Sequence, residues 1–221
     1  MPIITIKSIE LIMFPTARLT DGTTFAISSI QEVLSIAPYI ERLDCSSMGL
    51  TELPADLYFP NLTHWDLSGN SLVTLPNDLN LPSLKNLDLH QNALQSLPEN
   101  LNSICPVLRK LNCGFNQLTA LPPLDFFHQL RELHCSNNQI QNLPTLQLPN
   151  LKKLGISNNH LTSLPENMFL PRLLELSCQN NPLVSLPQNM NFPKLINFNV
   201  PFIRPVLPPG FGSSTLCVNG W

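Results

Sequence analysis

The stretch that decides the fold is Leu62-Thr63-His64-Trp65-Asp66-Leu67-Ser68-Gly69-Asn70-Ser71-Leu72, which has the pattern L-x-x-L-x-L-x-x-N-x-L. Five later blocks share each key position of this pattern: residues 84–94, 108–118, 130–140, 151–161 and 173–183. Weaker copies begin at Ile40 and Leu195, and the eight starts are spaced by 22, 22, 24, 22, 21, 22 and 22 residues. A fixed period of this length is typical of solenoids, so eight turns of one coil are predicted.

The first and last copies depart from the pattern. Met48 and Ile203 stand where the asparagine belongs, and Phe198 and Val200 replace leucines in the last copy. Degenerate terminal repeats are expected of a solenoid, because its ends meet a cap or solvent in place of a neighbouring coil.

Most of the 22 prolines are placed at regular breaks between the blocks. Proline lacks the backbone N–H and fixes φ, so it suits turns and disfavours helix interiors and central strands. We therefore expect turns after each block, at the leucine-proline pairs that end in Pro76, Pro98, Pro122, Pro144, Pro165 and Pro187.

Within each block, the residues alternate as in a strand. The second and third leucine positions point inward, and the residues around them point to the opposite face. The asparagines come where the chain leaves the strand, and we predict that they satisfy backbone groups that water cannot reach. This structural set is Asn70, Asn92, Asn116, Asn138, Asn159 and Asn181.

At about residues 40–202, these motifs resemble the leucine-rich-repeat family. The resemblance implies an α/β-type solenoid with a curved parallel sheet on its concave face and an irregular convex side of short turns. The L-x-x-L-P-x-x-L variant is similar to repeats of bacterial effectors, which pathogens deliver into host cells. Some of those effectors also carry a ubiquitin-ligase domain, which is not expected here because the sequence ends at Trp221.

Three regions are predicted. Residues 1–39 form an N-terminal cap, with a strand-rich segment at 3–14, a turn at Asp21-Gly22, a second strand at 23–27 and a helix at 29–36 capped by Ser28 or Ser29. The cap is expected to cover the core of the first coil. Residues 40–200 form the repeats, and residues 201–221 form an irregular C-terminal cap or tail held by Phe202, Phe211 and Trp221.

Composition disfavours two classes of partner. Only 12% of the residues are charged and the formal net charge is -3, which gives no electrostatic reason to bind nucleic acid or an anionic membrane. The N-terminal segment carries Lys7 and Glu10 within its apolar run and does not read as a Sec signal peptide. No stretch of about 18 apolar residues predicts a membrane-spanning helix.

Four of the six cysteines align with the third leucine position and are predicted to be core thiols: Cys45, Cys113, Cys135 and Cys178. Cys105 aligns with the apolar Leu81, and Cys217 has no explanation from the repeat. Unpaired buried thiols favour a reducing compartment. For an effector this means the bacterial cytoplasm and then the host cytosol.

No catalytic residues, metal ligands or cofactor are predicted. His134 adjoins Cys135, but consecutive strand residues point to opposite faces and cannot form a dyad. His90 and His134 are two coils apart, roughly 10 Å, which is too far for one zinc ion to bridge. The lone glycosylation sequon at Asn61 is interpreted as chance.

The outward face carries the candidate binding residues. Three aspartates stack in successive coils, which indicates either a solvated charged face or a docking strip for basic or hydrogen-bond-donating groups. Phe115 is a candidate anchor, because its counterparts are Gly69, Gln91, Asn137 and Asn158, whereas Trp65 is predicted to be core. The predicted partner-binding set is Asp44, His64, Asp66, Asp88, His90, Lys110, Asn112, Phe115, Glu132, His134 and Lys153.

The function expected from this reading is non-catalytic binding of one folded protein partner by a chain that is a monomer on its own. By analogy with the effectors, the partner is modulated or occluded, and an enzyme whose active site is covered is one such partner. Two alternatives remain open. The chain is the recognition part of a larger enzyme such as a ubiquitin ligase, or it is a scaffold with several weak partners.

Overall fold

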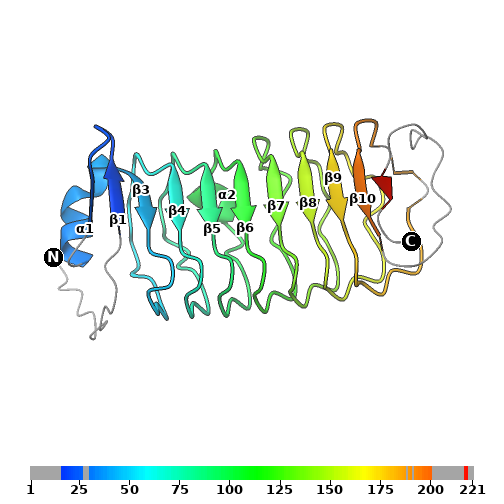
Figure 1. Ribbon diagram of the computed structural model, residues 1–221, viewed down its shortest axis with the longest axis horizontal. Helices are drawn as coiled ribbons and strands as arrows, with labels where there is room; N and C mark the ends of the chain where they lie inside the picture. The colour runs from blue at the N-terminus through cyan, green and yellow to red at the C-terminus, as the bar shows by residue number, and fades with distance from the viewer. Residues whose placement is uncertain (1–15, 27–29, 188, 191, 201–216, 219–221) are drawn as a thin grey trace.

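The computed structural model describes residues 16–26, 30–187, 189–190, 192–200 and 217–218. Within them, successive turns of a coil stack along one axis, and each turn adds one short strand to a single sheet (Figure 1). The strand order is β11-β10-β9-β8-β7-β6-β5-β4-β3-β1-β2. Strands that are neighbours in the repeat sequence are therefore neighbours in space.

In this described part, eight parallel strands form the repeat region, which confirms the predicted fold class. The middle residue of each three-residue strand is buried, as the alternation of the pattern requires. The strands are β3 (Ile40–Asp44), β4 (His64–Asp66), β5 (Asn86–Asp88), β6 (Lys110–Asn112), β7 (Glu132–His134), β8 (Lys153–Gly155), β9 (Glu175–Ser177) and β10 (Asn197–Asn199).

The side of the coil opposite the strands consists mainly of turns and extended backbone. Two isolated parallel bridges, Tyr58 with Asn80 and Gln147 with Phe169, connect adjacent turns there. The short helix α2 (Leu101–Ile104) lies in the one repeat that is 24 residues long. The extra residues of that repeat give room for a helical turn without disturbing the spacing of the strands.

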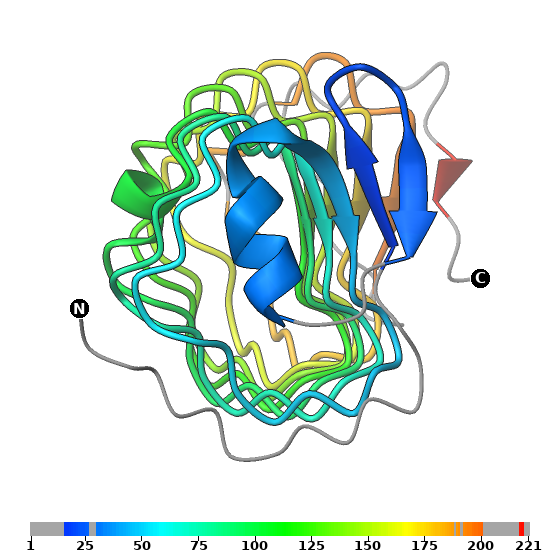
Figure 2. The same ribbon diagram turned by 90° about the vertical axis from the view of Figure 1, so that its left-hand side faces the viewer.

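The N-terminal cap combines a hairpin and a helix. Strands β1 (Thr16–Leu19) and β2 (Thr24–Ala26) are joined by a turn in which Thr23 N donates to Asp21 Oδ1 (2.9 Å). Helix α1 (Ile30–Ile36) follows and runs into the 3-10 turn η1 (Ala37–Tyr39). Figure 2 shows α1 lying across the open end of the coil, with the hairpin beside the concave face of the sheet.

The helix α1 and the strand β2 lie within the predicted ranges 29–36 and 23–27, whereas the strand β1 was not predicted. The helix covers the end of the core through Val33, but the hairpin extends the sheet by antiparallel pairing of β1 with β3. The first strand lies at Thr16–Leu19, directly before the turn, and the predicted segment 3–14 and the caps Ser28 and Ser29 fall outside the described residues. Pairing with β3 explains why the hairpin continues the sheet, while Ala17 of β1 is buried in the core.

The C-terminal end adds one strand that the sequence did not predict. β11 (Cys217–Val218) pairs in parallel with β10 and continues the direction of the repeat strands. The predicted irregular wrap, with Phe202, Phe211 and Trp221, lies outside the described residues.

An asparagine ladder joins adjacent coils. In Asn116, Oδ1 accepts from the backbone N–H of Leu94 (2.9 Å), and Nδ2 donates to the carbonyls of Leu89 (2.9 Å) in the preceding coil and Cys113 (3.1 Å) in its own. A single side chain thus satisfies backbone groups of two coils. The same arrangement recurs at Asn70, Asn92, Asn138, Asn159 and Asn181.

The core is a continuous column of leucines inside the coil. Trp65 is buried and packs edge-on against Phe59 with ring centroids 5.6 Å apart, which confirms it as a core residue. Burial raises the pKa of the Cys45, Cys105, Cys113 and Cys178 thiols to about 12, and the pKa of Cys135 is also well above its ordinary value. These five cysteines are free and buried, as the repeat alignment predicts.

Neither α-helix in the described ranges is long and apolar enough to cross a membrane.

Replacing Asn116 with alanine is expected to lower the free energy of unfolding by about 2 kcal/mol or more, because buried backbone groups in two coils lose their partner. Urea denaturation followed by circular dichroism measures this difference. The matched control is Asn142→Ala, which changes an exposed asparagine and is expected to cost under about 0.5 kcal/mol. Equal stability of the two variants would contradict the role of the ladder.

Thiol reactivity tests the burial of the cysteines. In a Cys217→Ser variant at pH 8.5, the remaining thiols are expected to react with a maleimide on the order of 100-fold more slowly in the native protein than in urea. The reason is that the thiolate is the reactive species and burial raises each pKa. Rapid labelling of all five in the native protein would show that the core is open.

Candidate protein-binding surface

The sheet presents two rows of outward side chains that run along the axis of the coil. The first row starts in β1 and comprises Arg18, Arg42, His64, Asn86, Lys110, Glu132, Lys153 and Glu175. The second row comprises Thr16, Asp44, Asp66, Asp88, Asn112, His134, Gly155 and Ser177. Members of a row are direct cross-strand neighbours, so the strands set their spacing at about 4.8 Å.

The three aspartates of the second row have a local structural role. One carboxylate oxygen of each accepts from the backbone N–H two residues later: Asp44 from Ser46 (2.9 Å), Asp66 from Ser68 (2.9 Å) and Asp88 from His90 (3.0 Å). These bonds stabilise the turn out of each strand. They also fix the carboxylates in place, although like charges at this spacing repel by about 1 kcal/mol per pair in water.

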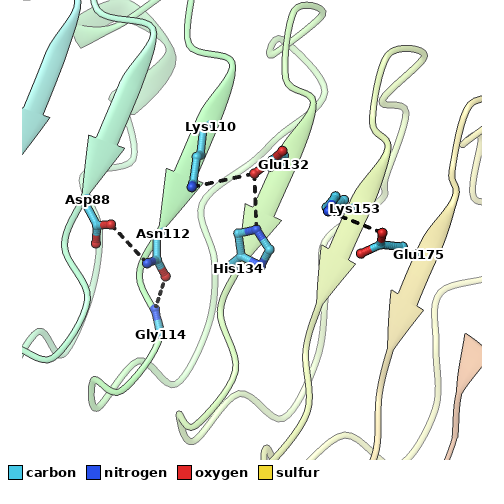
Figure 3. A network of polar contacts seen from close by, with 8 residues as sticks. All are labelled: Asp88, Lys110, Asn112, Gly114, Glu132, His134, Lys153 and Glu175. Carbon is cyan, nitrogen blue, oxygen red and sulfur yellow. Dashed lines mark hydrogen bonds and ion pairs between the residues drawn. The ribbon is translucent and has the colours of Figure 1, made fainter. Parts of the chain in front are cut away.

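Polar contacts in the middle of the sheet are largely internal (Figure 3). Glu132 lies between Lys110 (Nζ to Oε2, 3.7 Å) and His134 (Nε2 to Oε2, 3.6 Å). Lys153 pairs with Glu175 (Nζ to Oε1, 3.3 Å). Over β6–β9, the cations and anions of the first row therefore compensate one another.

The N-terminal end of the sheet is hollowed into a groove of about 400 Å³. Its floor is formed by β3–β6, and Thr16, Ala17, Arg18 and Thr24 of the hairpin form one wall. The register of β1 on β3 shifts between Arg18 and Leu19, where β3 has one extra residue. Such a bulge bends a strand, which accounts for the hairpin standing beside the concave face.

His64 lies in this groove between Arg42 and Asn86 in the first row. Burial lowers its pKa, and the Arg42 guanidinium lowers it further. Both effects favour the neutral form of the ring. Thr63 Oγ1 lies 2.8 Å from Nδ1 of His64 and fixes the orientation of the imidazole.

A second, shallower depression of about 300 Å³ lies further along the sheet. His90 and Phe115 form an edge-to-face pair at its side, with ring centroids 5.0 Å apart and an interplanar angle of 66°. The buried Gly114 belongs to its lining, and a Cβ there would lie 3.4 Å from Nδ1 of His90. The remaining lining residues are Lys110, Asn112, His134 and Ser136.

Phe115 combines exposure with backbone strain. Its side chain is 53% exposed, and its φ is 54°, in the left-handed region. The equivalent residues Gly69, Gln91, Asn137, Asn158 and Asn180 also have positive φ. Glycine and asparagine adopt this conformation readily, whereas other residues pay roughly 1–2 kcal/mol. Within the described residues, the ring of Phe115 makes the edge-to-face pair with His90.

The histidines of the face do not form a reactive site. Cys135 is buried in the core and its Sγ donates to the Gly155 carbonyl (3.4 Å), while His134 faces outward. Among the described residues, no three His, Cys, Asp or Glu side chains are grouped so that they could hold a metal ion.

The structure distributes the predicted binding residues over two sites. Asp44, His64, Asp66 and Asp88 line the groove, whereas His90, Asn112, Phe115 and His134 line the shallower depression. Lys110 belongs to both, Glu132 bridges Lys110 and His134, and Lys153 pairs with Glu175 outside both.

Sequence reasoning missed the contribution of the hairpin. Arg18, Thr16 and Thr24 belong to the groove, and so does Arg42, which was not among the predicted binding residues. The turn at Asp21-Gly22 was the available signal, because a hairpin places its first strand directly before its turn.

The stacked coils, the inward leucines and the asparagine ladder form a fold of the leucine-rich-repeat type. A family model of leucine-rich repeats matches residues 82–126 and 128–168. The fold is similar to that of the leucine-rich effector protein YopM from Yersinia pestis, with 28% identity and a TM-score of 0.56 over 76% of this chain. YopM from Yersinia enterocolitica gives 28% identity and a TM-score of 0.58 over 80% of it.

The chain spans about half the length of these effectors, covering 50% of the first and 45% of the second. A leucine-rich-repeat protein from Leptospira interrogans shares the fold at 23% identity, with a TM-score of 0.57 over 82% of this chain and 65% of that one. No curated protein matches the sequence significantly.

Two substitutions of Phe115 separate its strain from its contacts. Phe115→Asn is expected to be more stable than Phe115→Ala by about 0.5–1 kcal/mol, because both lack the ring but only asparagine relieves the left-handed backbone. Chemical denaturation of the two variants side by side measures the difference. Equal stability, or a more stable alanine variant, would show that the position is unstrained.

Proposed function

We propose that this protein is a non-catalytic effector module of bacterial origin that binds one folded protein partner through the concave face of its sheet and occludes it. The likeness to the Yersinia effectors supports the effector assignment, and the leucine-rich-repeat fold supports protein binding. The buried free thiols favour action in a reducing compartment, which for an effector is the bacterial cytoplasm followed by the host cytosol.

Phe115 is the observation that carries the proposal. An exposed aromatic ring held on a strained backbone costs the free protein stability, and such costs are characteristic of functional positions. The ring borders a depression with a polar rim, which is the usual surrounding of an interface anchor. Its partner ring His90 holds it in one orientation, so little side-chain entropy is lost when a partner binds.

Electrostatics favour the same face. The aspartates of the second row lie in register on three adjacent strands, and a partner with complementary groups would be guided to them before close contact forms.

Exposed aromatic residues also lie elsewhere, as at Phe126, in the turn segment between β6 and β7. That residue has no positive φ, and it provides a matched control.

Affinity purification from host-cell lysate, followed by mass spectrometry, tests the proposal. We expect one dominant partner, and Phe115→Ala is expected to weaken its binding at least about fivefold, whereas Phe126→Ala leaves it within twofold. Circular dichroism of each variant checks folding. Loss of binding in Phe126→Ala with wild-type affinity in Phe115→Ala would move the interface to the convex side.

A second candidate function is substrate recognition within a larger enzyme such as a ubiquitin ligase. The observation that favours it is that this chain covers only about half the length of the Yersinia effectors. Sequencing the gene beyond the codon for Trp221 separates the two. A reading frame that continues into a catalytic domain would favour the recognition role. If the affinity purification instead yields several ligands that each bind with micromolar affinity, the chain is a scaffold.

A further inference from the structure

The groove beside the hairpin differs from the rest of the sheet in how its charges are balanced. Four ion pairs occur among the described residues. Among the groove residues in these pairs, only Lys110 has its partner, Glu132, within β6–β9. Arg18 reaches Glu41 only at 4.0 Å, with both side chains exposed to solvent. Within these residues, Arg42 and the three aspartates have no ion-pair partner.

The two signs of charge lie on opposite sides of this groove. Arg18 and Arg42 are direct cross-strand neighbours in the first row, and Lys110 lies further along it. Asp44, Asp66 and Asp88 lie in the second row, two residues further along each strand, which is about 6.6 Å away. The cationic side and the anionic side therefore run parallel along the axis of the coil.

An extended polypeptide can reach both rows at once. In a strand, successive side chains point to opposite sides, so a strand lying along the groove would send alternate side chains to the aspartates and to the arginines. Side chains on one side of a strand repeat about every 6.6–6.8 Å, whereas the aspartates repeat about every 4.8 Å along the axis, so two basic side chains would face the three aspartates. The groove volume, about 400 Å³, is within the usual range for a site that takes a few side chains.

We infer that the groove between the β1–β2 hairpin and β3–β5 binds an extended segment of the partner polypeptide in which basic and acidic side chains alternate. The basic side chains contact Asp44, Asp66 and Asp88, and the acidic ones contact Arg18 and Arg42. This inference rests on the proposed function, since it names the chemistry of the segment that a protein partner presents. The Phe115 depression then holds a separate part of the same partner.

Hydrogen bonds to the following turn orient the three aspartate carboxylates before any peptide binds. Oδ1 of each carboxylate accepts the turn bond from the backbone, and all three residues line the groove. In Asp88, the second oxygen, Oδ2, accepts from Nδ2 of Asn112 (3.2 Å). Asn112 itself occupies the same row and accepts from Gly114 N through Oδ1 (3.3 Å). An asparagine thus supports the turn without the charge, which makes Asp→Asn a substitution that keeps the backbone.

The experiment uses the full chain and two blocked hexapeptides of identical composition. One alternates lysine and glutamate, and the other has three glutamates followed by three lysines. Titration of the isotope-labelled protein, followed by NMR, is expected to give at least about fivefold tighter binding of the alternating peptide, with shifts at Arg42, Asp44, Asp66 and Asp88. Affinity is expected to fall with added salt, because the contacts are exposed to solvent.

Three variants locate the contacts. Asp66→Asn combined with Asp88→Asn, and Arg42→Gln alone, are each expected to weaken the alternating peptide at least about threefold. Glu175→Gln removes a charge from the same sheet outside the groove and is expected to leave affinity within twofold. Equal binding of the two hexapeptides, equally tight binding of an all-lysine peptide, or no effect of the aspartate pair would overturn the inference.

The outcomes also separate this inference from the proposed function. If the purified partner binds, depends on Phe115, and is neither displaced by the alternating peptide nor weakened by the aspartate pair, the proposed function stands and the groove inference is wrong. If the alternating peptide binds as described but lysate yields no dominant partner, the inference about the groove stands and the proposed function fails.

Discussion

Every coil of this molecule depends on how the buried backbone is satisfied where each strand ends. A leucine interior excludes water, so the N–H and C=O groups of the turn need partners within the protein. Asn116 and its equivalents provide these partners by bonding their own coil and the preceding one. Because the ladder holds the coils in register, the outward residues of successive strands fall into straight rows, and the geometry of the outward face depends on this buried chemistry.

Features that repeat were the most fully predictable from the sequence. Of those that occur once, the helix α1, the turn at Asp21-Gly22 and the strand β2 were predicted, whereas β1 and β11 were not. The spacing of the blocks placed β3–β10, and the alignment placed Trp65 and the buried cysteines in the core, because each inference draws on several equivalent positions. Strand β1 has no counterpart in other coils, and the apolar residues before it were the stronger strand signal. Pairing between distant segments, such as Arg18 with Arg42, is a tertiary property that local patterns do not contain.

The candidate binding residues show the same division. Alternation correctly assigned Asp44, Asp66 and Asp88 to the outward face, but not their hydrogen bonds to the following turn. The sequence indicated that Phe115 is unusual among polar counterparts, and only the backbone shows that it is strained. The ion pairs along the sheet could not be predicted from the sequence either, because the pairing of Lys110 and His134 with Glu132 depends on the direction of each side chain. Consequently the sequence suggested one continuous strip, whereas the structure has two hollows of different chemistry.

The helix α2 in the 24-residue repeat shows that the two sides of the coil tolerate changes in length differently. β5 and β6 remain paired in register although the connection between them is the longest of the series. The outer turns can therefore absorb an insertion without shifting the outward side chains of the sheet. This makes the segment around Leu101–Ile104 a suitable place to graft an epitope tag or a small fluorescent reporter while the opposite surface remains available for recognition.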